Sequence, residues 1–415
     1  MRLIHTADWH IGQTLNGWTR EAEHRAFLAR LCDVVEEHAA DVLVVAGDVF
    51  DGINPSGESL QMLYEGLVAL RGRRPRLTTV MVAGNHDPAG RLEAPAAVLR
   101  AIGVHVVGVM HRREGVIDMD RHLVPLADAT GSVRAHLLAI PFLRAADLPG
   151  LGVLTPQDDA DGEAGSPVVR ATRRLYAEAT AAALGRAQGL PLLATGHLHC
   201  SGAAESEGAE RRILVGGEHA VPPDVFPADL AYVALGHLHK PQAVGRASVR
   251  YSGSPFPLSA TELPYEHGVT LVEIGDGGVR SEHIRLARPV PCLRVPETGA
   301  LTLPALEGAL AALGLDPQTP VELRPFVHVV VAPEGSVAGL SAEVERVLQA
   351  HPVRCAGVRV ERPAATAAGP DAALPVVPLA ERSPVDLFAR AFEAEHGSAP
   401  TPRHMAAFHD AETEG

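Results

Sequence analysis

The stretch DVLVVAGDVFD at residues 41–51 decides the fold, because a short aliphatic run ends there in a glycine and an acidic residue, Asp48. Aliphatic runs of this length are typical of strands that are buried on both faces. The pattern recurs as RLIHT before Asp8, as TTVMVAG before Asn85, and later as PLLATGHLH and LAYVALGHLH. Between the first two runs, apolar residues from Phe27 to His38 predict a helix of about seventeen residues. Strands that alternate with helices predict a layered α/β fold.

Polar side chains follow each of these predicted strands. Because the carboxyl ends of strands in an α/β sheet meet at one edge, residues that are far apart in the chain can form one cluster there. The predicted cluster consists of Asp8, His10, Asp48, Asn85, His86, Asp87, His197, His237 and His239. Oxygen and imidazole ligands without cysteine suit Mn²⁺, Mg²⁺ or Fe²⁺ better than a structural zinc ion. The pattern therefore predicts a centre for two divalent metal ions, which Asp48 is placed to bridge.

A centre of this kind predicts hydrolysis of a phosphate ester. Two cations about 3.5 to 4 Å apart can clamp a phosphate and lower the pKa of a bridging water, which yields a hydroxide nucleophile. A histidine beside the metals can donate a proton to the departing oxygen or stabilise the charged transition state, and we assign this role to His86. Asp51, Asp87 and His199 are candidates for supporting positions around the ligands, although Asp51 and His199 are equally compatible with ordinary turns.

The two Gly-His-Leu-His motifs leave one ligand open, because either His197 or His199 can follow the first strand of the pair. His5 and His24 are expected to be structural. In the segment after residue 56, Leu60, Leu63, Tyr64 and Leu67 can form either a dimer surface or one face of a core helix.

The remainder of the chain divides by composition. A Gly, Asp and Pro-rich stretch at about 147–167 predicts a long loop, and the Ala-rich segment 169–187 predicts a helix. We expect a main domain at 1–288, a small second domain of βαβ pattern at 289–362, an Ala/Pro-rich linker at 363–379 and C-terminal helices at 380–415. Within the second domain the predicted elements are helix 303–313, strand 321–331, helix 341–350 and strand 353–360. The C-terminal helices carry apolar residues that a tethered pair cannot bury alone, so they bind a partner or dock on the main body.

The bulk composition is compatible with these predictions and argues against several other classes of protein. No apolar stretch is long enough to span a bilayer, and the strand begins at once after Met1 without a signal sequence, so we expect a cytoplasmic protein with no membrane contact. The four cysteines lack CxxC spacing, which argues against a zinc site and against a disulfide framework. The net charge of −14 argues against a nucleic-acid binder, unless bound cations offset the acidic groups and a partner supplies basic surface.

The motifs D-x-H, G-D-x-x-D, G-N-H-D, G-H and G-H-x-H, in this order, resemble those of the calcineurin-like metallophosphoesterase superfamily. Within it, IHTADWHIGQTLNG at 4–17, YSGSPFPLS at 251–259 and ELRPFVHVVV at 322–331 resemble the SbcD family of bacterial nuclease subunits. The resemblance implies a metallophosphoesterase sandwich, with two mixed β-sheets flanked by helices. It also implies a small α+β capping domain and a C-terminal helical tail.

The resemblance also implies roles for individual residues. One metal would be bound by Asp8, His10, Asp48 and His239, and the other by Asp48, Asn85, His197 and His237. His86 would be the catalytic histidine, and His197 is favoured over His199, which the family motif does not require.

The family implies Mn²⁺-dependent 3′ to 5′ exonuclease and endonuclease activity on DNA ends and hairpins in double-strand break repair. It further implies a nucleoid-associated complex with SbcC, an ABC-type ATPase with a coiled coil, in which this chain forms a homodimer within a heterotetramer. The chain has no GxxxxGK[ST] phosphate loop of its own, in agreement with an ATPase partner.

Two other functions use the same features. A small-molecule phosphodiesterase or phosphatase would need identical metal ligands, but it would not need a cap and tethered helices. A non-catalytic scaffold with a vestigial centre is the third hypothesis, and the sequence lacks none of the expected ligands.

Overall fold

The computed structural model describes residues 1–148, 166–206, 220–333 and 339–361, together with a few separate residues beyond position 387. It divides into two compact units, Met1–Glu361 and Arg362–Gly415. The predicted linker at 363–379 and most of the predicted helices at 380–415 lie outside the described residues, as does most of the predicted loop at 147–167.

The first unit contains two mixed six-stranded sheets. The first sheet has the order β16-β15-β1-β4-β5-β6, in which β1, β4, β5 and β6 are parallel and β15 and β16 are antiparallel to their neighbours. Its strands are β1 (Arg2–Thr6), β4 (Val42–Ala46), β5 (Thr78–Val82), β6 (Val104–Val107), β15 (Gly268–Gly275) and β16 (Gly278–Arg285).

The second sheet has the order β13-β14-β12-β11-β10-β9, with β10, β11, β12 and β14 parallel. Its strands are β9 (Leu123–Ala127), β10 (Val133–Leu138), β11 (Leu192–His197), β12 (Leu230–Gly236), β13 (Gln242–Val244) and β14 (Arg246–Tyr251). Two short antiparallel ribbons belong to neither sheet. One pairs β2 (Thr14–Leu15) with β3 (Trp18–Thr19), and the other pairs β7 (Arg112–Arg113) with β8 (Val116–Ile117).

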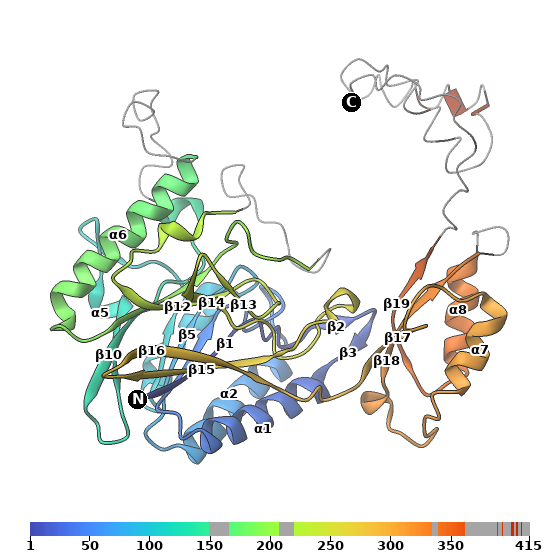
Figure 1. Cartoon of the computed structure of the whole chain (residues 1–415), viewed down its shortest axis with the longest axis horizontal. Coiled ribbons are helices and arrows are strands. Elements are labelled where there is room, and N and C mark those ends of the chain that lie inside the picture. The colour runs from blue at the N-terminus through green and yellow to red at the C-terminus, as the bar shows by residue number, and fades with distance from the viewer. Residues whose placement is uncertain are drawn as a thin grey trace. The chain divides into compact units, whose positions relative to one another are not determined.

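Three hydrophobic cores show that the two sheets face each other between layers of helices (Figure 1). Along β4, Val42 and Val44 belong to the core between the sheets, whereas Leu43 and Val45 belong to the core under α1 and α2. Successive strand residues point to opposite faces, so a run of five buried aliphatic residues can serve both cores. The helices are α1 (Glu21–Glu37), α2 (Gly57–Arg73), α3 (Ala89–Glu93), α4 (Ala96–Arg100), α5 (Met119–His122) and α6 (Pro167–Ala187).

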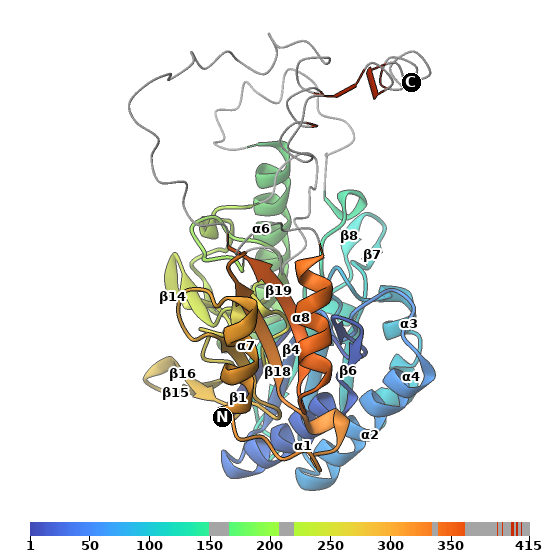
Figure 2. The ribbon, with the colours of Figure 1, turned by 90° about the vertical axis from the view of Figure 1, so that its right-hand side faces the viewer.

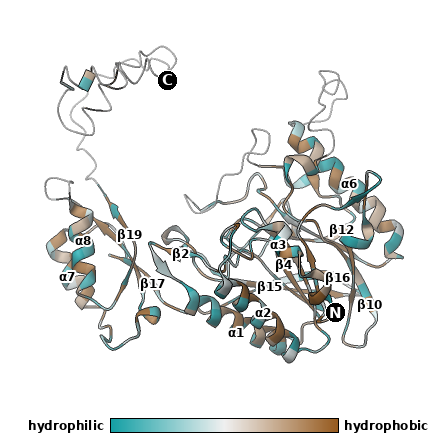
Figure 3. Ribbon diagram, turned by 180° about the vertical axis from the view of Figure 1, so that it is seen from behind, coloured by the Kyte–Doolittle hydropathy of each residue, from teal (hydrophilic) through white to brown (hydrophobic). Residues whose placement is uncertain are grey.

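The helices are amphipathic, as Figure 3 shows by the two colours along α1 and α6. Helix α1 is 17 residues long, which confirms the length predicted from its spacing of apolar residues. On α2, Leu63 and Leu67 lie in the core with Leu60 and Tyr64 packed against it, so these four residues form a core face. Among the described helices, none is long and apolar enough to cross a membrane.

A third, three-stranded parallel sheet follows at residues 292–360 and has its own core. Strands β17 (Cys292–Val295), β18 (Phe326–Val331) and β19 (Arg354–Val360) alternate with α7 (Leu303–Ala311) and α8 (Leu340–Gln349), which confirms the predicted βαβ pattern. Figure 2 shows α7 and α8 beside these strands. The strand predicted from Val321 is wrong at its start, because Val321–Leu323 forms a 3₁₀ turn and the strand begins at Phe326.

The two histidines expected to be structural are buried and hydrogen-bonded. His24 lies between the carbonyl oxygens of Trp9 and Arg20. The ring of His5 lies between the Tyr232 hydroxyl and the Leu235 carbonyl oxygen of β12, so it links the two sheets. Burial lowers the pKa of His5 to about 3.

The low pKa of His5 predicts a pH dependence of stability. Between about pH 6.5 and the folded pKa, the unfolded chain binds a proton at His5 that the folded chain does not, so stability falls as the pH falls. The variant His5→Gln should therefore lose roughly 1 kcal/mol less unfolding free energy per pH unit than the wild type in this window. Denaturant titrations at pH 7, 6 and 5 would measure this, and parallel curves for the two proteins would contradict it.

Candidate metal centre

The strands that carry the predicted ligands meet at one edge. In the first sheet β1, β4 and β5 are parallel neighbours, and they lead into Asp8, Asp48 and Asn85. In the second sheet β11 and β12 are parallel neighbours, and they lead into His197 and His237. Because β4 also contacts β11 and β12, both sets of strand ends open into the same space.

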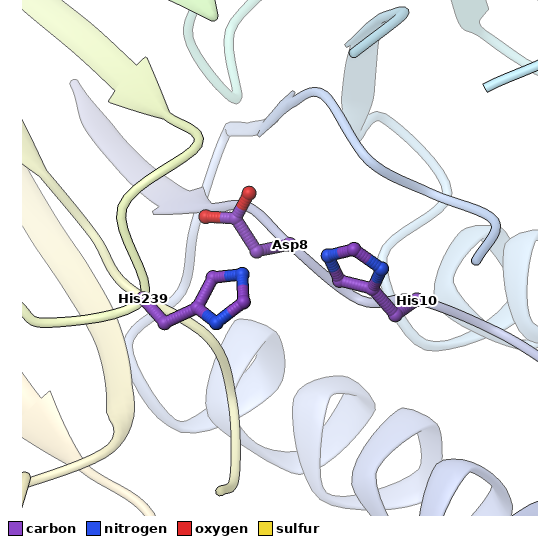
Figure 4. Close-up of side chains that lie close together, drawn as sticks. All are labelled: Asp8, His10 and His239. Atoms are coloured by element: carbon purple, nitrogen blue, oxygen red, sulfur yellow. The ribbon is translucent and has the colours of Figure 1, made fainter. Parts of the chain in front are cut away.

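Three overlapping groups of side chains could each hold a metal ion, with ligand atoms within 4.8 Å of one another in each group. Figure 4 shows the first group, in which the rings of His10 and His239 lie around the Asp8 carboxylate. The groups are Asp8 with His10 and His239, Asp48 with His197 and His237, and His10 with Asp48 and His86.

Asp48 lies at the centre of the cluster. Its Oδ2 atom is 3.2 Å from Nε2 of His197 and 3.6 Å from Nε2 of His10, which come from different sheets. Its Oδ1 atom accepts a hydrogen bond of 2.8 Å from the backbone N–H of His86. The carboxylate is therefore placed between the two groups of ligands, as a bridging position requires.

The hydrogen bonds of His197 show that a cation fits this space. Its Nδ1 lies 2.9 Å from the Ala46 carbonyl oxygen, which can only accept, so Nδ1 carries the ring proton. Its Nε2 then directs a lone pair toward two oxygen atoms, Asp48 Oδ2 at 3.2 Å and Asn85 Oδ1 at 2.9 Å. Lone pairs that converge in this way repel one another unless a proton or a metal ion lies between them.

Two further atoms support the same conclusion. Asp8 Oδ2 and His10 Nε2 are buried without a hydrogen-bond partner among the described residues. A buried carboxylate oxygen without a partner is costly, because burial removes its water. The donor set of carboxylate, imidazole and amide oxygen also suits a divalent cation of the Mn²⁺, Mg²⁺ or Fe²⁺ type. The residues present therefore fit a pair of metal ions.

The pKa values of the buried acidic and imidazole groups also reflect how closely these groups are packed. Burial raises the pKa of Asp8 to about 6, and burial together with the charge of Asp48 raises that of Asp87 to about 6. Burial alone would raise the pKa of Asp48, but the neighbouring histidines hold it well below its usual range. Burial would lower the pKa of His197, yet Asp48 and Asp8 raise it to about 9.

The backbone around the ligands is strained. Asp8, His10, Asp48 and His237 have positive φ angles of 55°, 47°, 50° and 100°. Such conformations are uncommon for residues with a side chain and cluster at functional sites, where the surrounding structure enforces them. The turn after each strand thus aims its side chain into the space between the sheets.

The remaining predicted residues make different contacts around the candidate ligands. His86 is held by its Nδ1, which donates to the Asp51 carbonyl oxygen at 2.8 Å, and the Asp51 carboxylate lies 3.1 Å from Nδ1 of His10. Asp87 accepts hydrogen bonds from the backbone N–H groups of Val49, Phe50 and Gly84 and so joins the turns after β4 and β5.

His199 lies beside a different carboxylate, although its ring centroid is 6.3 Å from that of His237. Its Nε2 pairs with Glu205 at 3.2 Å, and it belongs to none of the three candidate metal groups in the described part of the chain. The geometry therefore favours His197 as the ligand that the first Gly-His-Leu-His motif contributes.

The sequence analysis missed Glu262. This fully buried carboxylate lies 2.8 Å from Nδ1 of His239 and also accepts from the backbone N–H of Leu258, so it orients the His239 ring. The signal was weak, because Glu262 ends a short 3₁₀ turn (Ala260–Glu262) outside the strand-end motifs, and only its burial distinguishes it from ordinary glutamates.

Family models cover both parts of the chain. The model described as Calcineurin-like phosphoesterase matches residues 1–201, and the model described as Type 5 capsule protein repressor C-terminal domain (SbcD_C) matches residues 288–396. Together with the two facing sheets and the clustered ligands, the first match defines the class. This protein is a metal-dependent phosphoesterase with the calcineurin-like fold.

Curated relatives narrow the class. The chain is 53% identical to the SbcD subunit of the SbcCD nuclease from Rhodobacter capsulatus over 94% of each chain. It is 36% identical to the SbcD subunits from Bacillus subtilis, over 67% of each chain, and from Escherichia coli K12, over 75% of this chain and 72% of that one. The chain belongs to the SbcD family of nuclease subunits.

Gly84 offers a test of the position of Asp48. A Cβ atom at Gly84 would lie 2.1 Å from Asp48 Oδ1 and 2.4 Å from the Asp48 backbone nitrogen, so Gly84→Ala must displace the carboxylate. We expect phosphodiesterase activity to fall by about 100-fold, the size of effect that follows a misplacement of about 1 Å. Gly90→Ala is the matched control, since nothing lies within 4 Å of its added Cβ. Equal activity of the two variants would contradict the central position of Asp48.

Glu262 offers a test of the support for His239. Glu262→Ala should weaken Mn²⁺ affinity by about 10-fold to 100-fold, as is typical when a carboxylate that orients a histidine ligand is removed. Titration against a chelating metal indicator would measure the affinity. Glu266→Ala, which removes an exposed carboxylate from the same loop, is the control and should bind Mn²⁺ like the wild type.

Proposed function

We propose that this enzyme hydrolyses phosphodiester bonds in DNA, at DNA ends and hairpins, by 3′ to 5′ exonuclease and endonuclease action. The observation that carries the proposal is the close placement of two candidate ligand groups. His10 of the first group and His197 of the second group both lie within 4 Å of the Asp48 carboxylate, and His86 forms a further group with His10 and Asp48. Support also comes from the relationship to the SbcD subunits of SbcCD nucleases, one of which matches 94% of this chain.

The proposed ligands extend two of the three groups, Asp8 with His10 and His239 and Asp48 with His197 and His237. Asp8, His10, Asp48 and His239 would hold one divalent ion, and Asp48, Asn85, His197 and His237 would hold the other. When bound, two such ions supply a polarised phosphate and an activated water. The protein's own contribution is to hold these side chains in place, all of them buried except the half-buried Asn85, in surroundings where charges act strongly.

His86 is the proposed catalytic residue. Its Nδ1 proton is donated to the Asp51 carbonyl oxygen, which fixes the ring, and its backbone N–H binds Asp48. In its protonated form the Nε2–H group can donate to the departing oxygen of the substrate or to a phosphate oxygen. The ring lies 4.7 Å from that of His10, so the proton donor is next to the proposed ligands.

The biological setting is proposed from the family. We infer Mn²⁺ as the working metal, an SbcC-type ABC ATPase as the partner, and a homodimer of this chain within a heterotetramer that acts in double-strand break repair at the nucleoid. The third sheet and its helices, within the proposed domain at 289–362, would cap the DNA-binding surface, and the segment at 380–415 would bind the partner. Partner surface and bound cations would offset the net charge of −14.

The test is cleavage of a labelled hairpin-ended duplex with Mn²⁺, with and without the ATPase partner. His86→Ala should cut at least about 100-fold more slowly than the wild type, because a proton donor contributes 10²- to 10⁴-fold to rate. Its Mn²⁺ affinity should remain close to that of the wild type.

His105→Ala, which changes a half-buried histidine on β6, is the control and should cut normally. If the wild type leaves DNA intact under all conditions but hydrolyses bis(p-nitrophenyl) phosphate, the small-molecule phosphodiesterase becomes the better assignment.

A further inference from the structure

Outside the metal centre, a second cluster of buried charges joins the third sheet to the rest of the first unit. It consists of Arg20, Glu23 and Arg354, whose relative exposures are 2%, 2% and 1%. Arg20 and Glu23 belong to the start of α1, whereas Arg354 begins β19. Charged side chains are almost never this buried unless they are paired.

Glu23 is the only carboxylate of the cluster and lies between the two arginines. Arg20 donates two hydrogen bonds to it, of 3.1 and 2.7 Å, and Nη2 of Arg354 lies 3.7 Å from its Oε2 atom. The Phe326 ring of β18 lies against both guanidinium groups, with Cζ of Arg354 at 3.8 Å and Cζ of Arg20 at 5.5 Å from its centroid. The cluster therefore carries two positive charges and one negative charge in a buried space.

Arg354 reaches across from the third sheet. Its Nη1 donates to the Thr19 carbonyl oxygen of β3 at 3.3 Å, while its Nε donates at 2.9 Å to the carbonyl oxygen of Arg324, which lies just before β18 of its own sheet. One side chain is thus bonded both to the ribbon β2–β3 and to the third sheet. Substituting one member of the pair while the junction stays closed would leave a buried charge without its partner, which is strongly unfavourable.

The same cluster is connected to the metal centre. Arg20 Nη1 donates to the Gln13 side chain, and the Arg20 carbonyl oxygen lies 2.9 Å from the ring of His24, whose other nitrogen lies 2.9 Å from the carbonyl oxygen of Trp9. Trp9 stands between the proposed ligands Asp8 and His10. A cavity of about 510 Å³ is lined by Gln13, Thr19 and Arg20 on one side and by Asp51, which holds His86, on the other.

We propose that the Arg20–Glu23–Arg354 cluster is a positioning device that fixes the third sheet relative to the metal centre, and that DNA cleavage depends on this position whereas hydrolysis of a small phosphodiester does not. The inference rests on the proposed nuclease function. A small diester needs only the metals and His86. A DNA strand also contacts surface beyond the scissile phosphate, and such contacts set its register.

Glu23→Gln removes the negative charge and leaves two buried guanidinium groups facing each other, which displaces the third sheet. Cleavage of the hairpin-ended duplex should fall by at least about 10-fold, while hydrolysis of bis(p-nitrophenyl) phosphate with Mn²⁺ should stay within about twofold of the wild type. Arg354→Met should show the same split between the substrates. The double variant should be no slower on DNA than the slower single variant, because the two residues act as one unit.

Two exposed residues provide matched controls. Glu21→Gln changes an exposed residue in the same turn of α1 as Glu23, and Arg359→Met changes an exposed residue on the same strand as Arg354. Both variants should cut DNA like the wild type. Normal DNA cleavage by Glu23→Gln and Arg354→Met would overturn the inference. An equal loss of DNA cleavage and of small-diester hydrolysis would also overturn it, provided that the variants melt at the same temperature as the wild type. A wild type that hydrolyses the small diester but leaves DNA intact would instead reject the proposed function.

Discussion

The structure depends on one electrostatic constraint, the convergence of carboxylate oxygens and imidazole lone pairs around Asp48. His10 and His197 approach the same oxygen from different sheets, at 3.6 and 3.2 Å, although neither sheet alone could bring them together. Such a cluster is unfavourable without positive charge. A pair of divalent cations would satisfy it, which explains how a site that strains four backbone positions fits a stable fold.

The two-sheet arrangement holds this cluster in place. Both faces of β4 are buried, one under α1 and α2 and the other against the second sheet, so the strand end is held rigidly on each side. Asp87 bonds three backbone N–H groups of the turns after β4 and β5, and thereby keeps the Asp48 turn in register with the His86 turn. Close control of ligand placement is what separates a working metal centre from a loose one.

The buried cluster of Arg20, Glu23 and Arg354 has a different role, because it joins the third sheet to the rest of the first unit. Arg354 bonds both to its own sheet and to the β2–β3 ribbon, and Glu23 neutralises one of the two arginines that meet there. The path from Arg20 through His24 to the Trp9 carbonyl oxygen shows that the two clusters share a contiguous set of contacts. The early segment from Asp8 to Glu23 therefore contributes both to the candidate metal centre and to the attachment of the third sheet.

Much of this could be predicted from the sequence, because the decisive signals are local. Aliphatic runs that end in Gly-Asp, Gly-Asn or Gly-His predicted the strands, and the shared edge of parallel strands predicted that Asp8, Asp48 and Asn85 would meet. The sequence by itself determined the layered fold and the βαβ pattern of the third sheet. Only the tertiary structure showed which carboxylates these two histidines lie beside, because both follow the same strand: His197 lies 3.2 Å from Asp48, and His199 lies 3.2 Å from Glu205. It alone revealed Glu262 and the pairing of Glu23 with Arg354, because contacts between residues far apart in the chain leave no periodic signal in the sequence.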